Sequence, residues 1–297
     1  MKHAVLVMGH GNLSILKRMI EILDDPRYDF YIHIDLKSSD NGKWLSDYCK
    51  YARCFYVERN AVYWGHHSMT DVAAALLAMA VSSGREYDYY HLVSGVDMPI
   101  KTPNEIDAFF EENAGTQFVR LIYPDREKIH DWRMKYRYPL LKLYRRGNKL
   151  LMNVQKLLYS RIIRFPRRPG TSILRDKGWR VYAGDEWFSI TDSLAKELVA
   201  MEKDMLPFWQ DCYAADETYV PTILMHLPEY SKNQSDYPTR EIDWSRGRPY
   251  VWQVEDYSVL IHSKALFARK FDPNNTAIAD MLYDVLITRK IQQTNCE

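Results

Sequence analysis

The sequence contains few cysteines and no long apolar run. No apolar segment approaches the roughly 18 residues that a membrane-spanning helix requires. Met1 and Lys2 lead directly into an apolar stretch, without the pattern of a signal peptide. The cysteines show neither a C-x-x-C spacing nor the density of a disulfide scaffold, which favours a reduced protein; they are Cys49, Cys54, Cys212 and Cys296. We therefore expect a cytoplasmic protein, in solution or peripheral on the inner membrane.

An excess of charge of either sign is also missing. The formal net charge is +1, and charged residues make up 27% of the 297 residues. This balance argues against disorder and against a nucleic-acid partner that binds the whole chain. The hydrophobic fraction of 46% is ample for a packed core, and length alone permits one large domain or two small ones. With no internal repeat or low-complexity tract, we expect a single domain over residues 1–297.

Metal-binding patterns are a third absence. No two aspartates are spaced i, i+2, so the D-x-D motif of many nucleotide-sugar enzymes is missing. The histidines and cysteines show no zinc spacing. We therefore expect neither a metal nor another cofactor, with fixed lysines and arginines supplying any positive charge that a site needs.

Short apolar runs alternate with segments of helical spacing through the first half of the chain. This alternation predicts βαβ units and an α/β fold with a Rossmann-like, mostly parallel sheet flanked by helices. The expected strands cover residues 3–8, 31–34, 54–57, 89–93 and 118–122. The expected helices cover residues 13–23, 41–51, 69–82 and 106–112, the last preceded by a capping box that starts at Thr102.

Polar and aromatic residues follow the expected strands. Met8 ends the first strand, Asp35 follows the second, Tyr63 the third and Asp97 the fourth. Ligands of such sheets bind beyond the carboxyl ends of the strands, so this rim suits a nucleotide. Asp35 and Asp97 can equally be caps of turns.

Two acidic segments stand out in the second half of the chain. Residues 183–190 read as a buried strand, with close backbone approach at Gly184, and carry Glu186. A helix from Ser193 to about Lys203 follows, and Asp216 and Glu217 stand where another helix is expected to begin.

The two adjacent acids allow different interpretations. Asp216 suits a helix cap, which is a structural role. Glu217 has Trp209, Tyr213 and Tyr219 as neighbours, and partial burial beside such rings raises a carboxyl pKa. Glu217 is therefore a candidate general base.

Cations in apolar or aromatic surroundings occur near the end of the chain. Arg246 and Arg248 stand beside Trp244, and Arg269 and Lys270 lie in an apolar frame. Arginines and lysines held in this way bind anions and can stabilise a leaving diphosphate.

The segment from Trp132 to Arg175 contains thirteen lysines and arginines and no acid. Apolar residues recur at helical spacing within it, which predicts a basic helical insertion at about residues 125–178. A solvated insertion, an amphipathic helix on an anionic membrane and a nucleic-acid contact all remain open, the last without a recognised motif.

These segments together resemble the core 2 / I-branching β-1,6-N-acetylglucosaminyltransferase family, which includes peptide O-xylosyltransferases, and favour a bacterial member. The resemblance covers residues 3 to about 285. It is carried by the motifs Tyr-Ile-His-Ile-Asp (31–35), Val-Tyr-Trp-Gly (62–65), Gly-Val-Asp-Met-Pro-Ile-Lys-Thr (95–102), Gly-Asp-Glu-Trp-Phe (184–188), Asp-Glu (216–217) and Leu-Phe-Ala-Arg-Lys-Phe-Asp (266–272).

The resemblance implies an inverting, metal-independent glycosyltransferase of GT-A type. Glu217 then matches the catalytic base, while Asp35, Tyr63 and the backbone near Met8 match uridine contacts. Lys270 and Arg248 match the diphosphate cations, with Arg246 as a rival to Arg248. The residues that fall on the acceptor side are Trp244, Arg137, Tyr138, Asp97 and Glu186.

The expected reaction moves a sugar, GlcNAc by preference, from a UDP-sugar to a glycan hydroxyl in surface polysaccharide synthesis. The acceptor could be carried on a lipid, with the enzyme in contact with an anionic membrane. Two alternatives remain: a UDP-xylose-dependent xylosyltransferase, and a non-catalytic module that binds nucleotide sugars.

Overall fold

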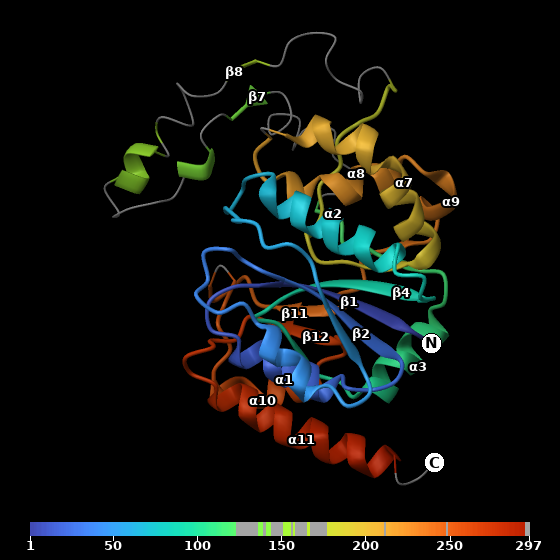
Figure 1. Ribbon diagram of the computed structural model, residues 1–297, viewed down its shortest axis with the longest axis vertical. Helices are drawn as coiled ribbons and strands as arrows, with labels where there is room; N and C mark the ends of the chain where they lie inside the picture. The colour runs from blue at the N-terminus through green and yellow to red at the C-terminus, as the bar shows by residue number, and fades with distance from the viewer. Residues whose placement is uncertain are drawn as a thin grey trace.

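A seven-stranded, mostly parallel sheet forms the centre of the protein (Figure 1). The computed structural model describes residues 1–122, 136–138, 141–143, 151–155, 157, 165–166, 177–210, 212–247 and 249–294. In spatial order the strands are β10 (Gln234–Ser235), β6 (Gln117–Phe118), β9 (Ser189–Thr191), β4 (Tyr89–Ser94), β1 (His3–Gly9), β2 (Tyr28–Ile34) and β3 (Arg53–Tyr56). Strand β9 runs antiparallel to both β4 and β6. The predicted α/β fold class is confirmed.

Helices cover both faces of the sheet because the central strands are apolar on both. Alternate residues of β1 enter two different cores, Val5 and Val7 in one and Ala4 and Leu6 in the other. The first core also receives α1 (Ser14–Ile22) and α11 (Ala277–Thr294), and the second receives α2 (Ser68–Val81) and α7 (Asp192–Trp209). Figure 1 shows these two helix layers on opposite sides of the sheet.

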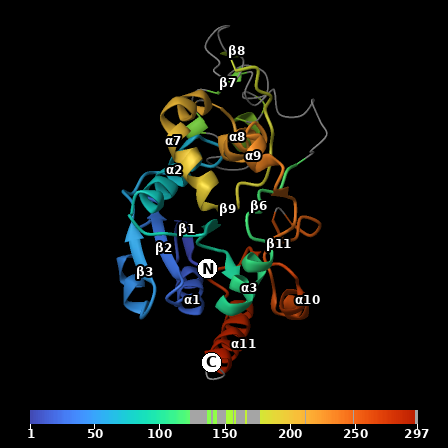
Figure 2. The ribbon, with the colours of Figure 1, turned by 90° about the vertical axis from the view of Figure 1, so that its right-hand side faces the viewer.

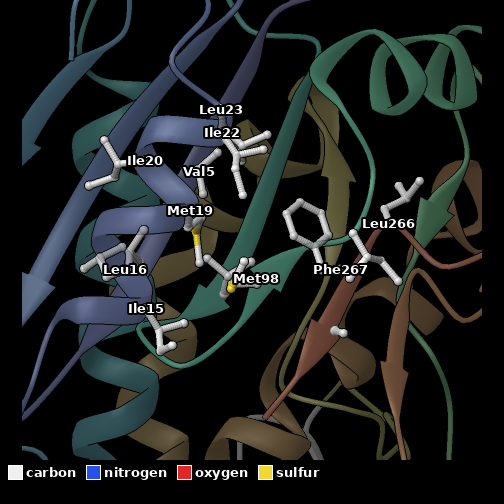
Figure 3. Close-up of a cluster of buried hydrophobic side chains, with 14 of the residues drawn as sticks. Val5, Ile15, Leu16, Met19, Ile20, Ile22, Leu23, Met98, Leu266 and Phe267 are labelled. Carbon is white, nitrogen blue, oxygen red and sulfur yellow. The ribbon is translucent and has the colours of Figure 1, made fainter. Parts of the chain in front are cut away.

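A smaller, three-stranded sheet brings the end of the chain to the centre. Its order is β11 (Arg240–Ile242), β12 (Phe267–Arg269) and β5 (Met98–Pro99). Because β12 pairs with β5, the Arg269–Lys270 step lies beside the turn that carries Asp97. Figure 3 shows Met98 and Phe267 of this sheet in the same core as Met19 of α1.

Shorter elements complete the described parts of the chain. Helix α3 (Pro103–Glu112) has the predicted capping box between Thr102 and Glu105. The other elements are η1 (Lys43–Tyr48), β7 (Tyr136–Arg137), η2 (Leu141–Leu143), β8 (Phe165–Pro166), η3 (Ala215–Glu217), α8 (Tyr219–Met225), α9 (Pro228–Ser231), η4 (Val254–Asp256) and α10 (Tyr257–His262). Figure 2 shows β3, β2 and β1 on one side of the molecule and β6 and β11 on the other.

Several predicted elements are wrong in extent or type. Residues 183–190 do not form one strand: only Ser189–Thr191 is a strand, with a single bridge between Gly184 and Leu121. The strand expected at 118–122 is reduced to Gln117–Phe118, and the helix expected at 41–51 is the 3₁₀ helix η1. Helix α7 continues to Trp209, and Asp216 and Glu217 lie in a 3₁₀ turn ahead of α8. In these segments, contacts with distant parts of the chain determine the backbone conformation, as the hydrogen bond from the Gly184 N–H to the Glu217 carbonyl shows.

Within the described ranges, no helix combines the length and apolar character needed to span a membrane. Most of the predicted basic insertion lies outside these ranges, so the single-domain arrangement with its insertion stays a prediction.

Candidate active site

Lys37 contacts both Asp35 and Tyr63. The backbone N–H of Asp35 donates to the carbonyl of Gly9 at 2.8 Å, which fixes Asp35 at the carboxyl end of β2. Its buried carboxylate pairs with the ammonium of Lys37 at 2.9 Å. The same ammonium lies 4.3 Å from the centre of the Tyr63 ring. The sequence stretch after β2 and the loop after β3 therefore form one cluster, as the rim rule predicts.

The end of β1 lies among the charges of this cluster. Burial lowers the pKa of His10, while Asp35 raises it and Lys270, Lys37 and Arg269 lower it further. Lys270 is far from Asp35 in the sequence, yet the charges of both residues affect the pKa of His10.

Met8 ends β1 in a tight contact with the next strand. Its side chain is buried, and its carbonyl accepts a hydrogen bond from the N–H of Gly95 at 2.9 Å. A Cβ on Gly95 would lie 3.0 Å from the Cα of Gly9. Glycine at position 95 therefore lets the ends of β1 and β4 approach each other.

Arg269 and its neighbour Lys270 are placed by different contacts. The backbone of Lys270 is held by the N–H of Trp252 and the carbonyl of Tyr250. The guanidinium of Arg269 lies 4.2 Å from the centre of the Trp187 ring, and its Nε lies 3.5 Å from a carboxylate oxygen of Asp97. Nε and Nη1 of Arg269 are buried and have no hydrogen-bond partner in the described part of the chain. Trp187 is a site residue that the sequence analysis did not select, whereas Arg269 was a candidate anion-binding cation together with Lys270.

Asp97 is buried at the end of β4. One carboxylate oxygen accepts from the Ser94 hydroxyl at 2.5 Å, and the other accepts from the Ser94 N–H at 2.9 Å. This is the turn-capping role that the sequence left open. The contact with Arg269 shows that the same carboxylate also faces the site.

Glu186 is the most strongly perturbed acid of the site. Burial raises its pKa well above the ordinary value, Asp216, Glu217 and Asp97 raise it further, and Arg269 opposes the rise. Its Oε1 is buried and finds no hydrogen-bond donor among the residues described. These mutual effects place Glu186 near Asp97 and Arg269, a group of three residues that we call the acid chamber, with Asp216 and Glu217 beside it. Burial and the neighbouring carboxylates therefore raise the pKa of Glu186 and favour the protonated form of its carboxyl.

The backbone around Glu217 is fixed on two sides. The N–H of Gly184 donates to the Glu217 carbonyl at 2.8 Å, and the N–H of Ala214 donates to the Gly65 carbonyl at 2.9 Å. Ala214 has φ of +50°, a conformation that costs a non-glycine residue about 1 kcal/mol or more. A Cβ on Gly184 would lie only 2.5 Å from the Arg120 carbonyl oxygen, which confirms the predicted close approach. The half-buried Glu217 therefore stands at a rigid turn beside the acid chamber.

The aromatic neighbours expected around Glu217 serve mainly as core. The indole N–H of Trp209 donates to the Thr218 hydroxyl at 2.9 Å, and Tyr219 packs edge-on against Trp209. Burial strongly raises the carboxyl pKa of Glu186, which lies in the same part of the protein.

The loop after β11 carries Trp244, whose side chain is 55% exposed. Arg246 pairs with Asp243 at 2.5 Å and with Asp256 at 2.7 Å. These ion pairs occupy Arg246 and make it a poor rival for the diphosphate role. Arg248 lies outside the described residues.

The two remaining acceptor-side residues come from β7 and the residue after it. Arg137 is exposed. Tyr138 is buried, with its ring 5.9 Å from that of Tyr213, which in turn lies 5.9 Å from the ring of Trp64. This aromatic row links the insertion to the turn that carries Glu217.

No group of three or more histidine, cysteine or acidic side chains is arranged to hold a metal within the described ranges. Metal-independent transfer stays a prediction.

Acids and cations at the carboxyl ends of parallel strands are typical of α/β enzymes that act on phosphate-bearing substrates. The family model described as Core-2/I-Branching enzyme matches residues 4–269. The chain therefore belongs to the Core-2/I-branching family and is a glycosyltransferase, which uses a nucleotide-sugar donor and a glycan acceptor.

Two further comparisons place the chain among known proteins. It is 22% identical to the human beta-1,3-galactosyl-O-glycosyl-glycoprotein beta-1,6-N-acetylglucosaminyltransferase, over 98% of this chain and 71% of that protein. A crystal structure of mouse xyloside xylosyltransferase 1 aligns with 12% identity over 90% of this chain and 97% of that chain, at a TM-score of 0.38. A score this low carries no argument about function.

Proposed function

We propose that the chain transfers a sugar, GlcNAc by preference, from a UDP-sugar to a glycan hydroxyl, with inversion and without a metal. The observation that carries the proposal is the placement of Glu217 at a backbone-locked turn beside the acid chamber. The donor preference is supported by the name of the human relative, a β-1,6-N-acetylglucosaminyltransferase.

The donor end of the site would hold UDP. Asp35, Lys37 and Tyr63 form a cluster of the size and polarity of a nucleoside site, with the backbone after Met8 beside it. Lys270 acts on the same region and would bind the diphosphate, with Arg248 as the second cation.

The reaction follows from the two carboxyl groups. Glu217 would accept the proton of the acceptor hydroxyl as that oxygen bonds to the anomeric carbon. The bond from the anomeric carbon to the diphosphate oxygen breaks on the opposite face, and Lys270 stabilises the charge of the departing UDP. The raised pKa of Glu186 favours its protonated form, which cannot accept a proton, and this supports Glu217 as the base.

The acid chamber would bind sugar hydroxyls on the acceptor side. Glu186 has a buried oxygen and Arg269 two buried nitrogens that lack partners among the described residues. Such groups cost about 1–3 kcal/mol each when unsatisfied, so a substrate that supplies their hydrogen bonds gains affinity and orientation. Asp97 would orient Arg269, and Trp244, Arg137 and Tyr138 would contact more distant parts of the glycan.

We further propose that the acceptor belongs to surface polysaccharide synthesis and is carried on a lipid. Residues 151–155 are helical, and Leu151, Val154 and Leu157 are 48%, 45% and 58% exposed. Apolar side chains exposed within a strongly basic segment support contact with an anionic membrane from the cytoplasm.

Release of UDP tests the proposal. The purified chain is incubated with UDP-GlcNAc, UDP-xylose, UDP-Gal and UDP-Glc, and both UDP release and the shift in melting temperature are measured. We expect the largest shift and the fastest release with UDP-GlcNAc. A preference for UDP-xylose would make the protein a xylosyltransferase, and binding without release of UDP from any donor would make it a non-catalytic module.

A further inference from the structure

Arg240 of β11 is a buried cation that forms no ion pair with a carboxylate among the described residues. Its Nη2 donates to the carbonyls of Leu92 at 2.9 Å and Phe188 at 2.7 Å. Its Nη1 donates to the hydroxyls of Thr239 at 2.8 Å and Ser189 at 3.4 Å. The residue is 7% exposed, and in the described part of the chain no acid lies within ion-pair distance of it. All its hydrogen bonds go to neutral oxygens.

The guanidinium lies where two strands separate. Strands β4 and β9 pair as far as His91 and Ser189, and the N–H of Leu92 still donates to the Phe188 carbonyl at 3.0 Å. Beyond this point the two strands separate, and we call this opening the fork. Arg240 donates hydrogen bonds to the carbonyls of Leu92 and Phe188 in the fork. One arm of the fork leads to Asp97 and the other comes from residues 185–187. These arms carry Asp97 and Glu186, the two acids of the acid chamber.

The positive charge of Arg240 acts on the acids of both arms. Burial lowers the pKa of Arg240 to about 10, while Asp97 and Asp185 raise it and Arg269 lowers it. Asp185 also faces Arg120, whose Nη1 lies 3.7 Å from it, and Glu217. Arg240 therefore places a fixed positive charge next to the acid chamber, which contains more acids than cations.

A chain of buried hydrogen bonds orients the guanidinium. His3 Nε2 lies 3.2 Å from the Asp107 carboxylate, which can only accept, so this nitrogen carries the proton. His3 Nδ1 then accepts from His91 Nε2 at 3.0 Å, and His91 Nδ1 accepts from the Ser189 hydroxyl at 2.8 Å. The Ser189 oxygen is left to accept from Arg240. Burial lowers the pKa of both histidines, so each is neutral and every donor points from Arg240 towards Asp107.

We propose that Arg240 is a positioning residue for sugar transfer: it holds the fork between β4 and β9 open and supplies the fixed positive charge beneath Asp97 and Asp185. This inference rests on the proposed function. A charge is expensive to bury, and the neutral oxygens to which Arg240 donates do not themselves require one. The positive charge acts instead on Asp97 and Asp185.

Two variants test the proposal. Arg240→Met keeps the volume and removes the charge, and Arg240→Lys keeps the charge but reaches fewer acceptors. We expect kcat to fall at least about tenfold in Arg240→Met and about threefold to tenfold in Arg240→Lys. The affinity for UDP should stay within about twofold, because the UDP residues lie on other elements. Arg240→Met removes the donor to the Leu92 and Phe188 carbonyls, so its melting temperature should fall, and that of Arg240→Lys should fall less. Arg85→Met, which breaks a half-buried pair with Asp29 at the start of β2, away from the site at the end of that strand, is the matched control and should leave kcat unchanged.

The split between turnover and UDP affinity distinguishes positioning from a merely structural role. A folded Arg240→Met protein with normal kcat overturns the proposal, as does a parallel loss of kcat, UDP affinity and melting temperature. If Arg240→Met does not fold, Arg240→Lys decides: reduced kcat at unchanged UDP affinity supports the proposal, and full kcat overturns it. Absence of turnover in the wild-type chain with every donor would instead refute the proposed function.

Discussion

The backbone N–H of Gly184 donates to the carbonyl of Glu217 at 2.8 Å. This bond joins the segment that carries Glu186 to the turn that carries the candidate base. Glycine is required there because a Cβ would collide with the Arg120 carbonyl and with Pro221. The spacing of the two carboxyl groups is therefore set by main-chain contacts, which hold more rigidly than flexible side chains do.

The first prediction separates Lys270 from Arg269. Removing a cation that meets developing charge costs roughly 3–4 kcal/mol of transition-state stabilisation. Lys270→Ala should therefore weaken UDP binding and slow transfer strongly. Arg269→Ala should affect UDP binding much less, because its guanidinium is held between Trp187 and Asp97. Calorimetric titration with UDP makes the comparison, and equal losses of affinity would show that both cations bind the diphosphate.

The second prediction concerns stability and pH. The raised pKa of Glu186 means that the folded state binds its proton more tightly than the unfolded state does. Stability from this group is present below the ordinary carboxyl pKa and is lost as pH rises towards the folded-state pKa. Glu186→Gln mimics the protonated form, so its melting temperature should exceed that of the wild type by a margin that grows from about pH 4 to pH 8. A margin independent of pH would contradict a buried, protonated Glu186.

The third prediction is that transfer survives excess EDTA. Lys270, with Arg248, would supply the charge that a metal supplies in enzymes with a D-x-D motif. UDP release is measured before and after chelation. Loss of activity that manganese restores would contradict metal-independent transfer.

The fourth prediction is that the basic segment between residues 132 and 175 attaches the protein to anionic membrane. Each lysine or arginine near such a surface contributes about 1 kcal/mol, and salt weakens the attraction. Co-sedimentation should show binding to anionic vesicles that disappears at high salt, with none to neutral vesicles. No binding to anionic vesicles at low salt would contradict membrane attachment.

The sequence predicted the parts of the fold that depend on local pattern. The buried strands β1, β2 and β4, the capping box at Thr102 and the rim position of Asp35 all follow from apolar runs and local polar residues. Segments governed by distant contacts were predicted poorly. The stretch 183–190 reads as a strand, but its backbone at Gly184 is bonded to Glu217 and crowded by Arg120.

Parts of the candidate site were also beyond sequence reasoning. The sequence named Arg269, with Lys270, as a candidate anion-binding cation, but nothing local indicates that its guanidinium lies on Trp187. Arg240 gave no signal, because its partners Leu92 and Phe188 are far away in the chain. The raised pKa of Glu186 was not foreseen, because its burial arises only when segments distant in the sequence assemble.

The most direct measurement is the single-turnover rate of Glu217→Gln with its preferred UDP-sugar and a glycan acceptor, beside Glu186→Gln as the matched control. Glutamine keeps the size of the side chain and removes its ability to accept a proton. We expect Glu217→Gln to lower the rate by roughly 10²–10⁴-fold with donor affinity little changed. Glu186→Gln should retain much more activity, because burial raises the pKa of Glu186 and favours the protonated form that glutamine mimics. Near-normal turnover in Glu217→Gln, with Glu186→Gln inactive, would contradict the assignment of Glu217 as the base.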